Sequence, residues 1–298
     1  MGHAYFGKDE GRGDAMTVNG WLSDAALRLA PVIGPAVAAR ELRLILRKAT
    51  GWSSAQLGVA GGTTLPAAAR AAADAMVLRR LAREPLAQIF GEWGFFGRSF
   101  RVTRATLVPR PDTETLVELA LAEPFARLID LGTGSGAIAV TLLAERPEAR
   151  GLASDISADA LAVAADNAQR HGVAGRLAFV QADWWAGLDG SFDLVVSNPP
   201  YVSQADYVGL APEITLWEPR GALTPGGDGL SAYRAILAPI TAFLCPGGRC
   251  LVEIGEAQGP AVAGLFRAAG LDDVVLHTDI NGKDRVVSGR KPSGRMGG

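Results

Sequence analysis

The sequence predicts an α/β protein in which a mostly parallel, seven-stranded sheet follows a small helical domain and a linking β-hairpin. Three observations support this prediction. Residues 22–84 are rich in Ala and Leu at helical spacing and contain no strand pattern. Apolar strand-like runs alternate with helical segments from residue 127 onward. A glycine-rich turn follows the first of these runs.

The amino-terminal region is predicted to be helical because its breakers lie at helix ends. Pro35 opens a helix over residues 36–49, where its missing N–H costs nothing, and Gly51 ends it. A second long helix follows Pro66. Aromatic and β-branched residues then surround glycines, which indicates a hairpin. The expected parts are a disordered leader at 1–20, a helical domain at 21–90, the hairpin linker at 91–108 and a catalytic domain at 109–298.

The α/β region begins with an apolar helix at 116–121, for which Asp112 is a suitable N-cap. Predicted strands cover residues 127–131, 151–154, 177–180, 192–197, 250–254, 274–277 and 285–288, and predicted helices cover 136–145, 158–170 and 230–244. Gly247 and Gly248 predict a turn into the fifth strand. The last two strands flank Asn281-Gly282, so we expect them to be antiparallel neighbours.

Composition excludes several classes of protein. The net charge is −2, which argues against wrapping of nucleic acid, although it leaves a local basic patch possible. Two cysteines and three histidines are too few and too scattered for a metal site. No run of 18 apolar residues and no signal-peptide pattern occurs. We therefore expect a cytoplasmic enzyme without a metal, and Met16 is a candidate natural start.

The first candidate site is the turn Asp130-Leu131-Gly132-Thr133-Gly134-Ser135-Gly136. Alternate glycines let a ligand approach the backbone, and ligands bind at the carboxyl ends of parallel strands. Asp155 ends the second strand, where a carboxylate can bind both hydroxyls of a ribose. Asp183 and Trp184 end the third strand, where they could contact an adenine base.

These residues also fit other interpretations. The glycines satisfy a loose dinucleotide fingerprint, so a nicotinamide dehydrogenase remains an alternative. Asp155 could cap the next helix, and Trp184 or its neighbour Trp185 could be a core aromatic. Arg110 and Glu114 could order a ligand pocket or pair with each other.

The second candidate site is Asn198-Pro199-Pro200-Tyr201, directly after an apolar strand. Consecutive prolines remove two backbone donors and stiffen the turn. The Asn198 side-chain oxygen and the Pro199 carbonyl can then accept both hydrogens of a planar –NH₂ group, beside the flat ring of Tyr201. This arrangement would aim the lone pair of an amide or aromatic amine at a methyl donor; the alternative is a plain proline-rich turn.

Together these motifs resemble the N5-glutamine methyltransferases that modify peptide chain release factors. The resemblance extends from about residue 21 to residue 290. Its more particular segments are 109–114, with Pro109-Arg110-Pro111 and Thr113-Glu114, and 218–230, with Glu218-Pro219 and Ala222-Leu223. Gly282-Lys283-Asp284-Arg285 is a further matching strip. A sheet that ends in an antiparallel hairpin is also the usual Rossmann-like arrangement of S-adenosylmethionine-dependent methyltransferases.

The resemblance implies methyl transfer from S-adenosylmethionine to the glutamine of a Gly-Gly-Gln loop in a release factor. It implies cofactor binding by Gly132, Thr133, Gly134, Ser135, Gly136, Asp155, Trp184 and Asn198. It implies substrate binding by Asn198, Pro199, Pro200 and Tyr201, of which Asn198 and Pro199 are the catalytic pair. The helical domain and the hairpin would help to seat the target protein.

Two further alternatives stay open. DNA and RNA adenine-N6 methyltransferases share the Asn-Pro-Pro-Tyr tetrapeptide, but the charge of −2 and the lack of an inserted basic target-recognition domain argue against them. A noncatalytic release-factor-binding module would associate without turnover. No membrane partner is expected.

Overall fold

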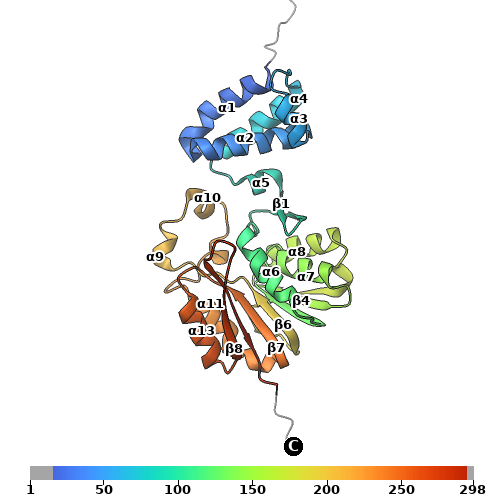
Figure 1. The fold of residues 1–298 in the computed structure, drawn as a ribbon, viewed down its shortest axis with the longest axis vertical. Coiled ribbons are helices and arrows are strands. Elements are labelled where there is room, and N and C mark those ends of the chain that lie inside the picture. Colours follow the sequence, from blue (N-terminus) through green and yellow to red (C-terminus); the bar gives the residue numbers. More distant parts are fainter. Residues whose placement is uncertain (1–15, 294–298) are drawn as a thin grey trace, which may run out of the picture. The chain divides into compact units, whose positions relative to one another are not determined.

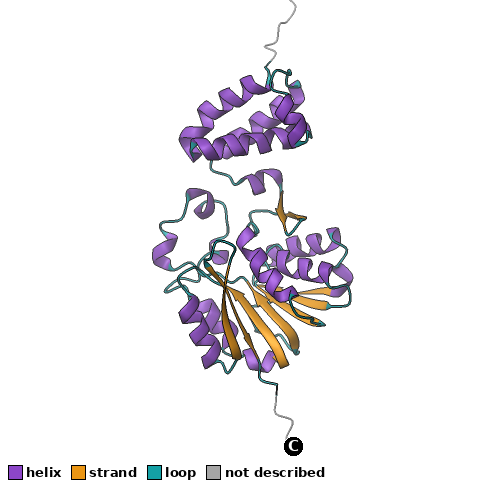
Figure 2. Cartoon of the chain, viewed as in Figure 1, coloured by secondary structure: helices purple, strands orange, loops and turns teal. Residues whose placement is uncertain are grey.

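The computed structural model describes residues 16–293. The chain divides into two compact units, Met1–Phe90 and Gly91–Gly298. Each unit has its own secondary structure (Figures 1 and 2). The predicted α/β sheet and the preceding helical region are both confirmed.

The first unit is helical, as predicted. Its helices are α1 (Val18–Ile33), α2 (Pro35–Thr50), α3 (Ser54–Val59), α4 (Ala67–Leu81) and α5 (Leu86–Phe90). Gly51 ends α2 at φ +73°, and its N–H bonds the Arg47 carbonyl. Helix α1 begins at Val18, so the predicted leader at 1–20 is too long; residues 1–15 lie outside the described residues.

The second unit begins with the predicted hairpin, formed by β1 (Glu92–Phe95) and β2 (Arg98–Arg101). A short 3₁₀ turn (Pro111–Thr113) leads into α6 (Glu114–Leu121). The prediction that Asp112 caps this helix is wrong. Asp112 lies inside the 3₁₀ turn, and one of its oxygens is 3.2 Å from Nη2 of Arg285. An ion pair with a distant strand has replaced the local cap.

All seven predicted sheet strands are present, in the order β5-β4-β3-β6-β7-β9-β8. They are β3 (Arg127–Leu131), β4 (Arg150–Asp155), β5 (Leu177–Gln181), β6 (Phe192–Ser197), β7 (Leu244–Glu253), β8 (Asp272–Thr278) and β9 (Asp284–Arg290). The pairs among β3 to β7 are parallel, whereas β9 is antiparallel to both β7 and β8. The predicted carboxyl-terminal hairpin is therefore confirmed.

Helices cover both faces of this sheet (Figure 1). One apolar core involves α6, α7 (Ala137–Glu145) and α8 (Ala158–Arg170). The other involves α11 (Ser231–Leu237), α12 (Ile240–Phe243) and α13 (Gly259–Ala268). The long excursion between β6 and α11 carries two short helices, α9 (Gln204–Tyr207) and α10 (Pro212–Thr215).

Two predicted elements need correction. The single helix at 230–244 is two helices, because Pro239 lacks an N–H and separates α11 from α12. The fifth strand begins at Leu244 rather than at residue 250. The predicted turn at Gly247 and Gly248 is an irregularity within that strand, where the pairing register with β6 shifts.

The strand order creates a switch point at the centre of the sheet. The chain runs from β3 outward to β5, then returns to place β6 on the other side of β3. Ligands of open α/β sheets bind outside the carboxyl ends of the strands at such a point. Both candidate sequences leave the sheet there, after β3 and after β6.

Candidate functional site

The glycine-rich turn after β3 has the backbone that its glycines permit. Gly132 and Gly134 have φ values of +69° and +56°, which side chains rarely adopt. A Cβ on Gly134 would meet nothing within 4 Å, so its backbone is open to a ligand. The Thr133 N–H bonds the Ser154 carbonyl at 2.9 Å and ties the turn to β4.

Gly136, at the start of α7, packs closely against α8. Its φ is +79°, and a Cβ there would lie 3.1 Å from the Cβ and 3.2 Å from the Cα of Ala164. The absent side chain lets α7 start close against α8. Gly136 is buried behind the turn and stands outside the cavity wall that its neighbours form.

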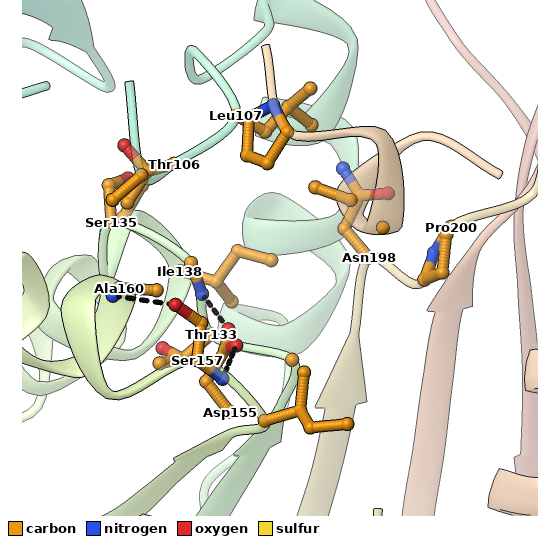
Figure 3. Close-up of a pocket in the computed structure, with 18 of the residues that line it drawn as sticks. Thr106, Leu107, Thr133, Ser135, Ile138, Asp155, Ser157, Ala160, Asn198 and Pro200 are labelled. Atoms are coloured by element: carbon orange, nitrogen blue, oxygen red, sulfur yellow. Dashed lines mark hydrogen bonds between the residues drawn. The ribbon is translucent and has the colours of Figure 1, made fainter. Parts of the chain in front are cut away.

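Asp155, at the end of β4, organises the backbone beside this turn. One carboxylate oxygen accepts the Gly134 N–H at 2.9 Å, and the other accepts the Ser157 N–H at 2.9 Å. The N-cap of α8 is Ser157, whose hydroxyl oxygen accepts the Ala160 N–H. Asp155 therefore supports the start of α8 and also faces the cavity (Figure 3). Each of its oxygens keeps a further lone pair for a ligand.

The two tryptophans after β5 separate clearly. Trp184 lines the cavity, and its ring would lie 3.6 Å from a Cβ built on Gly132. Its φ of +50° is uncommon for a residue with a side chain. Trp185 is a core residue: its ring stacks on Phe243, and its Nε1–H bonds the Ile236 carbonyl at 2.8 Å. Asp183 also lines the cavity.

The sheet brings Asn198 next to the glycine-rich turn. In the register of β3 and β6, Asp130 pairs with Val196, and the Ser197 hydroxyl bonds the Leu131 carbonyl at 2.7 Å. The residues that follow each strand, Gly132 and Asn198, thus leave the sheet side by side.

The tetrapeptide after β6 is divided between the cavity and its support. Asn198 and Pro200 line the cavity, whereas Pro199 and Tyr201 stand outside its wall. The Tyr201 carbonyl accepts a 2.9 Å hydrogen bond from Gln258 Nε2. Burial raises the pKa of Tyr201 to about 12, so its hydroxyl stays protonated at neutral pH.

These residues surround a cavity of about 400 Å³. Figure 3 shows Asn198 and Pro200 on one side of it and Thr133, Asp155 and Ser157 on the other. Sequence reasoning missed Thr106, Leu107 and Ile138, which also line it. No chemical signal marks these residues, because they contribute shape rather than charge.

A bidentate ion pair joins two loops of the cavity wall. Nη2 of Arg110 donates to both oxygens of Glu218, at 2.7 and 2.9 Å. Arg110 does not pair with Glu114, whose carboxylate instead accepts the Phe96 N–H at 2.7 Å. Burial raises the pKa of Glu218, and Arg110 opposes that rise. Of the two interpretations of Arg110, the pocket role agrees with the structure.

Two fully buried carboxylates lie at the base of the site. Burial raises the pKa of Asp130 to about 7, against hydrogen bonds from the Thr133 hydroxyl and the Ala139 N–H. Burial likewise raises the pKa of Glu253 to about 7, and side-chain hydrogen bonds with Thr113 and Asn198 oppose the rise. Sequence reasoning missed Glu253, although a charge within the apolar run Leu251-Val252-Glu253-Ile254 was a signal for it.

Both parts of the chain match known protein families. Residues 111–231 match the methyltransferase small domain, and residues 21–91 match the PrmC N-terminal domain. A solved methyltransferase from Pyrococcus furiosus has a similar fold, with a TM-score of 0.50 and 16% sequence identity over 74% of this chain and 98% of that chain. The fold and the site define the protein as a Rossmann-like methyltransferase.

Curated relatives are more specific. The release factor glutamine methyltransferase of Cereibacter sphaeroides is 55% identical over 86% of this chain and 92% of its own length. The relative of the same name from Rhodospirillum rubrum is 39% identical over 96% of this chain and 88% of its own. The chain belongs to the release factor glutamine methyltransferase family.

Neither a membrane span nor a metal cluster accompanies this site in the described part of the chain. Within residues 16–293, no helix is both long and apolar enough to cross a membrane. Over the same residues, no three His, Cys, Asp or Glu side chains gather in a way that could hold a metal ion.

Proposed function

We propose that this protein transfers a methyl group from S-adenosylmethionine to the side-chain amide nitrogen of the glutamine in the Gly-Gly-Gln motif of peptide chain release factors. The observation that carries the proposal is the adjacent exit of the glycine-rich turn and Asn198 from β3 and β6 into one cavity. Membership of the family supports the choice of glutamine and of release factors.

The cavity fits S-adenosylmethionine on structural grounds. The open backbone at Gly134 accommodates a close ligand, and Asp155 offers carboxylate lone pairs for ribose hydroxyls. Trp184 offers a flat surface for the adenine base. When bound, the cofactor supplies an electrophilic methyl group on a sulfonium sulfur. The family and the fold are those of methyltransferases, which favours this ligand over a dinucleotide.

Asn198 and Pro199 would act on the substrate amide. An amide nitrogen is a poor nucleophile because its lone pair is delocalised into the carbonyl group. Acceptance of its two N–H bonds by Asn198 Oδ1 and the Pro199 carbonyl would raise electron density on nitrogen and aim it for in-line attack. Such positioning can supply about 7 to 11 kcal/mol of a barrier. As the N–CH₃ bond forms, the S–CH₃ bond would break and leave a neutral thioether, while the nitrogen becomes acidic and its proton leaves to water.

We also propose that the helical domain at residues 21–90 helps to seat the release factor, and that the protein acts in the cytoplasm. The match of residues 21–91 to the PrmC N-terminal domain supports the first point. If the domain contributes to recognition, an intact release factor will have a lower KM than a short Gly-Gly-Gln peptide.

The decisive experiment is mass spectrometry of a purified release factor after incubation with this protein and S-adenosylmethionine carrying a deuterated methyl group. We expect one labelled methyl group on the glutamine of the Gly-Gly-Gln peptide, and much slower labelling when Asn198→Ala replaces the wild type in a time course. An unmethylated peptide from a folded release factor, with cofactor binding demonstrated by calorimetry, would contradict the proposal. Labelling of an adenine-containing oligonucleotide at the same rate would favour the adenine-N6 alternative.

A further inference from the structure

Glu253 is a buried carboxylate with no role in the mechanism above. It is the last residue of β7 and only 1% exposed, and its Oε2 atom has no hydrogen-bond partner. Both neighbouring strands hold its backbone in place. Ser197 pairs with Val252 in the β6–β7 register, and Glu253 pairs with Val286 of β9. Asn198 follows Ser197 and Glu253 follows Val252, so the two residues lie side by side at the ends of their strands.

The side-chain amide of Asn198 makes its contacts on the Glu253 side. Its Nδ2 donates to the Thr113 hydroxyl at 3.2 Å. Thr113 and Asn198 both lower the pKa of the Glu253 carboxyl group, which lies beside them. Among the described residues, no backbone or side-chain donor bonds Asn198 Oδ1. The amide is thus held through its NH₂ group, and its oxygen is left to accept.

An asparagine amide has two orientations related by a flip, and its partners decide between them. An ionised carboxylate only accepts hydrogen bonds, so it favours the orientation in which NH₂ faces it. A carboxylate on the NH₂ side also polarises the amide and makes its oxygen a stronger acceptor. Glutamine at position 253 could instead present its own NH₂ group and stabilise the flipped amide.

We propose that Glu253 is a positioning residue, which holds the Asn198 amide so that Oδ1 is the atom offered to the substrate glutamine. This inference rests on the proposed function for its catalytic consequence. The orientation itself can be tested without catalysis.

Other groups surround Glu253 and must be considered in a pH experiment. Arg285 on β9 lowers its pKa, and Asp112 of the 3₁₀ turn raises it. Tyr201 and Tyr233 also face it, and their own pKa values are raised, so both remain neutral near pH 7. Asp130, near the end of strand β3, which pairs with β6, also has a pKa of about 7. A titration with a midpoint near 7 is therefore assigned to Glu253 only by its loss in Glu253→Gln.

The test uses the full chain labelled with ¹⁵N-asparagine. The chain has four asparagines, Asn19, Asn167, Asn198 and Asn281, so the side-chain NH₂ spectrum is simple. The Asn198 signals are identified by their loss in Asn198→Ala. Asn167 is an internal reference, because its Nδ2 donates to the carbonyls of Arg101 at 3.0 Å and Ser135 at 2.8 Å.

We expect the Asn198 NH₂ signals of the wild type to shift with pH, with a midpoint near 7, while those of Asn167 stay constant. In Glu253→Gln the titration disappears. Asn198 signals that do not titrate in the wild type, or that titrate equally in Glu253→Gln, would overturn the inference. A wild-type protein in which the Asn198 signals do not titrate overturns the inference even if the variant does not fold.

Measurements of kcat and of cofactor affinity distinguish a role in positioning Asn198 from a role in binding the cofactor. With release factor as substrate, Glu253→Gln should lower kcat about 10- to 100-fold, a usual effect of losing a group that orients a functional side chain. Calorimetric affinity for S-adenosylmethionine should change little. Glu145→Gln, which removes a carboxylate from the surface pair with Arg98, is the matched control and should retain wild-type kcat.

Equal kcat for Glu253→Gln and Glu145→Gln would overturn the inference. An inactive wild type would instead contradict the proposed function. In that case the NMR titration would still test the orientation of the Asn198 amide by itself, because it needs no turnover.

Discussion

Arg110 holds Glu218 through two hydrogen bonds from a single nitrogen, Nη2, at 2.7 and 2.9 Å. The two residues are 108 positions apart in the chain and lie on separate loops of the cavity wall. The Glu218 side chain is 1% exposed, so its charge depends on this partner.

Replacing Arg110 by alanine should loosen the cavity, because it leaves a buried carboxylate unpaired. We expect a loss of about 1 to 3 kcal/mol in the free energy of unfolding and weaker binding of S-adenosylmethionine. Urea unfolding and calorimetry would measure the two effects. Arg101→Ala breaks a solvent-exposed pair with Asp166 and should cost less than about 1 kcal/mol. Equal losses in both variants would show that the Arg110 pair has no special role.

Asn198→Ala should lower kcat about 100- to 1000-fold, by analogy with the loss of one preorganised hydrogen-bonding group. Cofactor affinity should fall less than the rate, because the side chain acts on the substrate amide. Steady-state kinetics with a release factor would measure this. Asn281→Ala, the same substitution in the exposed β8–β9 loop, is the control. Near wild-type turnover in Asn198→Ala would remove Asn198 from the mechanism.

Asp155→Ala should mainly weaken cofactor binding. The substitution removes the acceptor for the Gly134 and Ser157 N–H groups and the carboxylate proposed to bind ribose. Isothermal titration calorimetry should give a higher Kd for S-adenosylhomocysteine, by about tenfold or more for a charge-assisted pair. Asp159→Ala, on the exposed first turn of α8, is a suitable control. An unchanged Kd in Asp155→Ala would contradict the ribose assignment.

Gly134→Ala and Gly136→Ala should differ in their principal effects. A Cβ at Gly136 would press on Ala164 at 3.1 Å, so the variant should lose about 1 to 3 kcal/mol of stability from overpacking. Gly134 also has a positive φ, so Gly134→Ala carries backbone strain too, but its Cβ would meet no protein atom within 4 Å and should mainly obstruct the ligand. Thermal unfolding together with cofactor titration distinguishes the two. A Gly134→Ala protein that binds the cofactor normally would show that the ligand does not approach this backbone.

The buried carboxyl groups of Asp130 and Glu253 should make stability fall as the pH rises from about 4 to about 7. Burial lowers the pKa of His277, which opposes this fall with a smaller contribution. Asp130 and Glu253 each have a folded-state pKa of about 7, against ordinary values of 3.8 and 4.5, because both are buried. Between the ordinary pKa and the folded-state pKa, each of these carboxyl groups is protonated in the folded protein but ionised in the unfolded chain. Its contribution to stability is therefore fully present below the ordinary pKa and is lost as the pH rises through the folded-state pKa of about 7.

Urea unfolding at pH 5 and pH 8 would measure this dependence. Glu253→Gln removes one of the two groups, so its loss of stability between these pH values should be smaller than that of the wild type. Glu145→Gln should reproduce the wild-type dependence, because its carboxylate is at the surface. A wild-type stability that rises over this range would contradict the expectation.

Much of the fold could be predicted from the sequence because its signals are local. Hydrophobic period, proline and glycine positions and the Asn281-Gly282 turn indicated the helical first unit, α6 to α8, all seven sheet strands and the final hairpin, but not α9, α10 or α13. The exceptions have physical causes as well. Pro239 divided a predicted helix, and Asp112 bonds Arg285 instead of capping α6.

The sequence by itself determined which residues could do chemistry: the glycine-rich turn, Asp155 and the tetrapeptide that begins at Asn198. Only the tertiary structure decided how they meet. It separated Trp184 from Trp185, gave Arg110 to Glu218 rather than Glu114, and set Glu253 beside Asn198. Such pairings depend on strand order and register, which join residues far apart in the chain and leave no periodic trace in either partner.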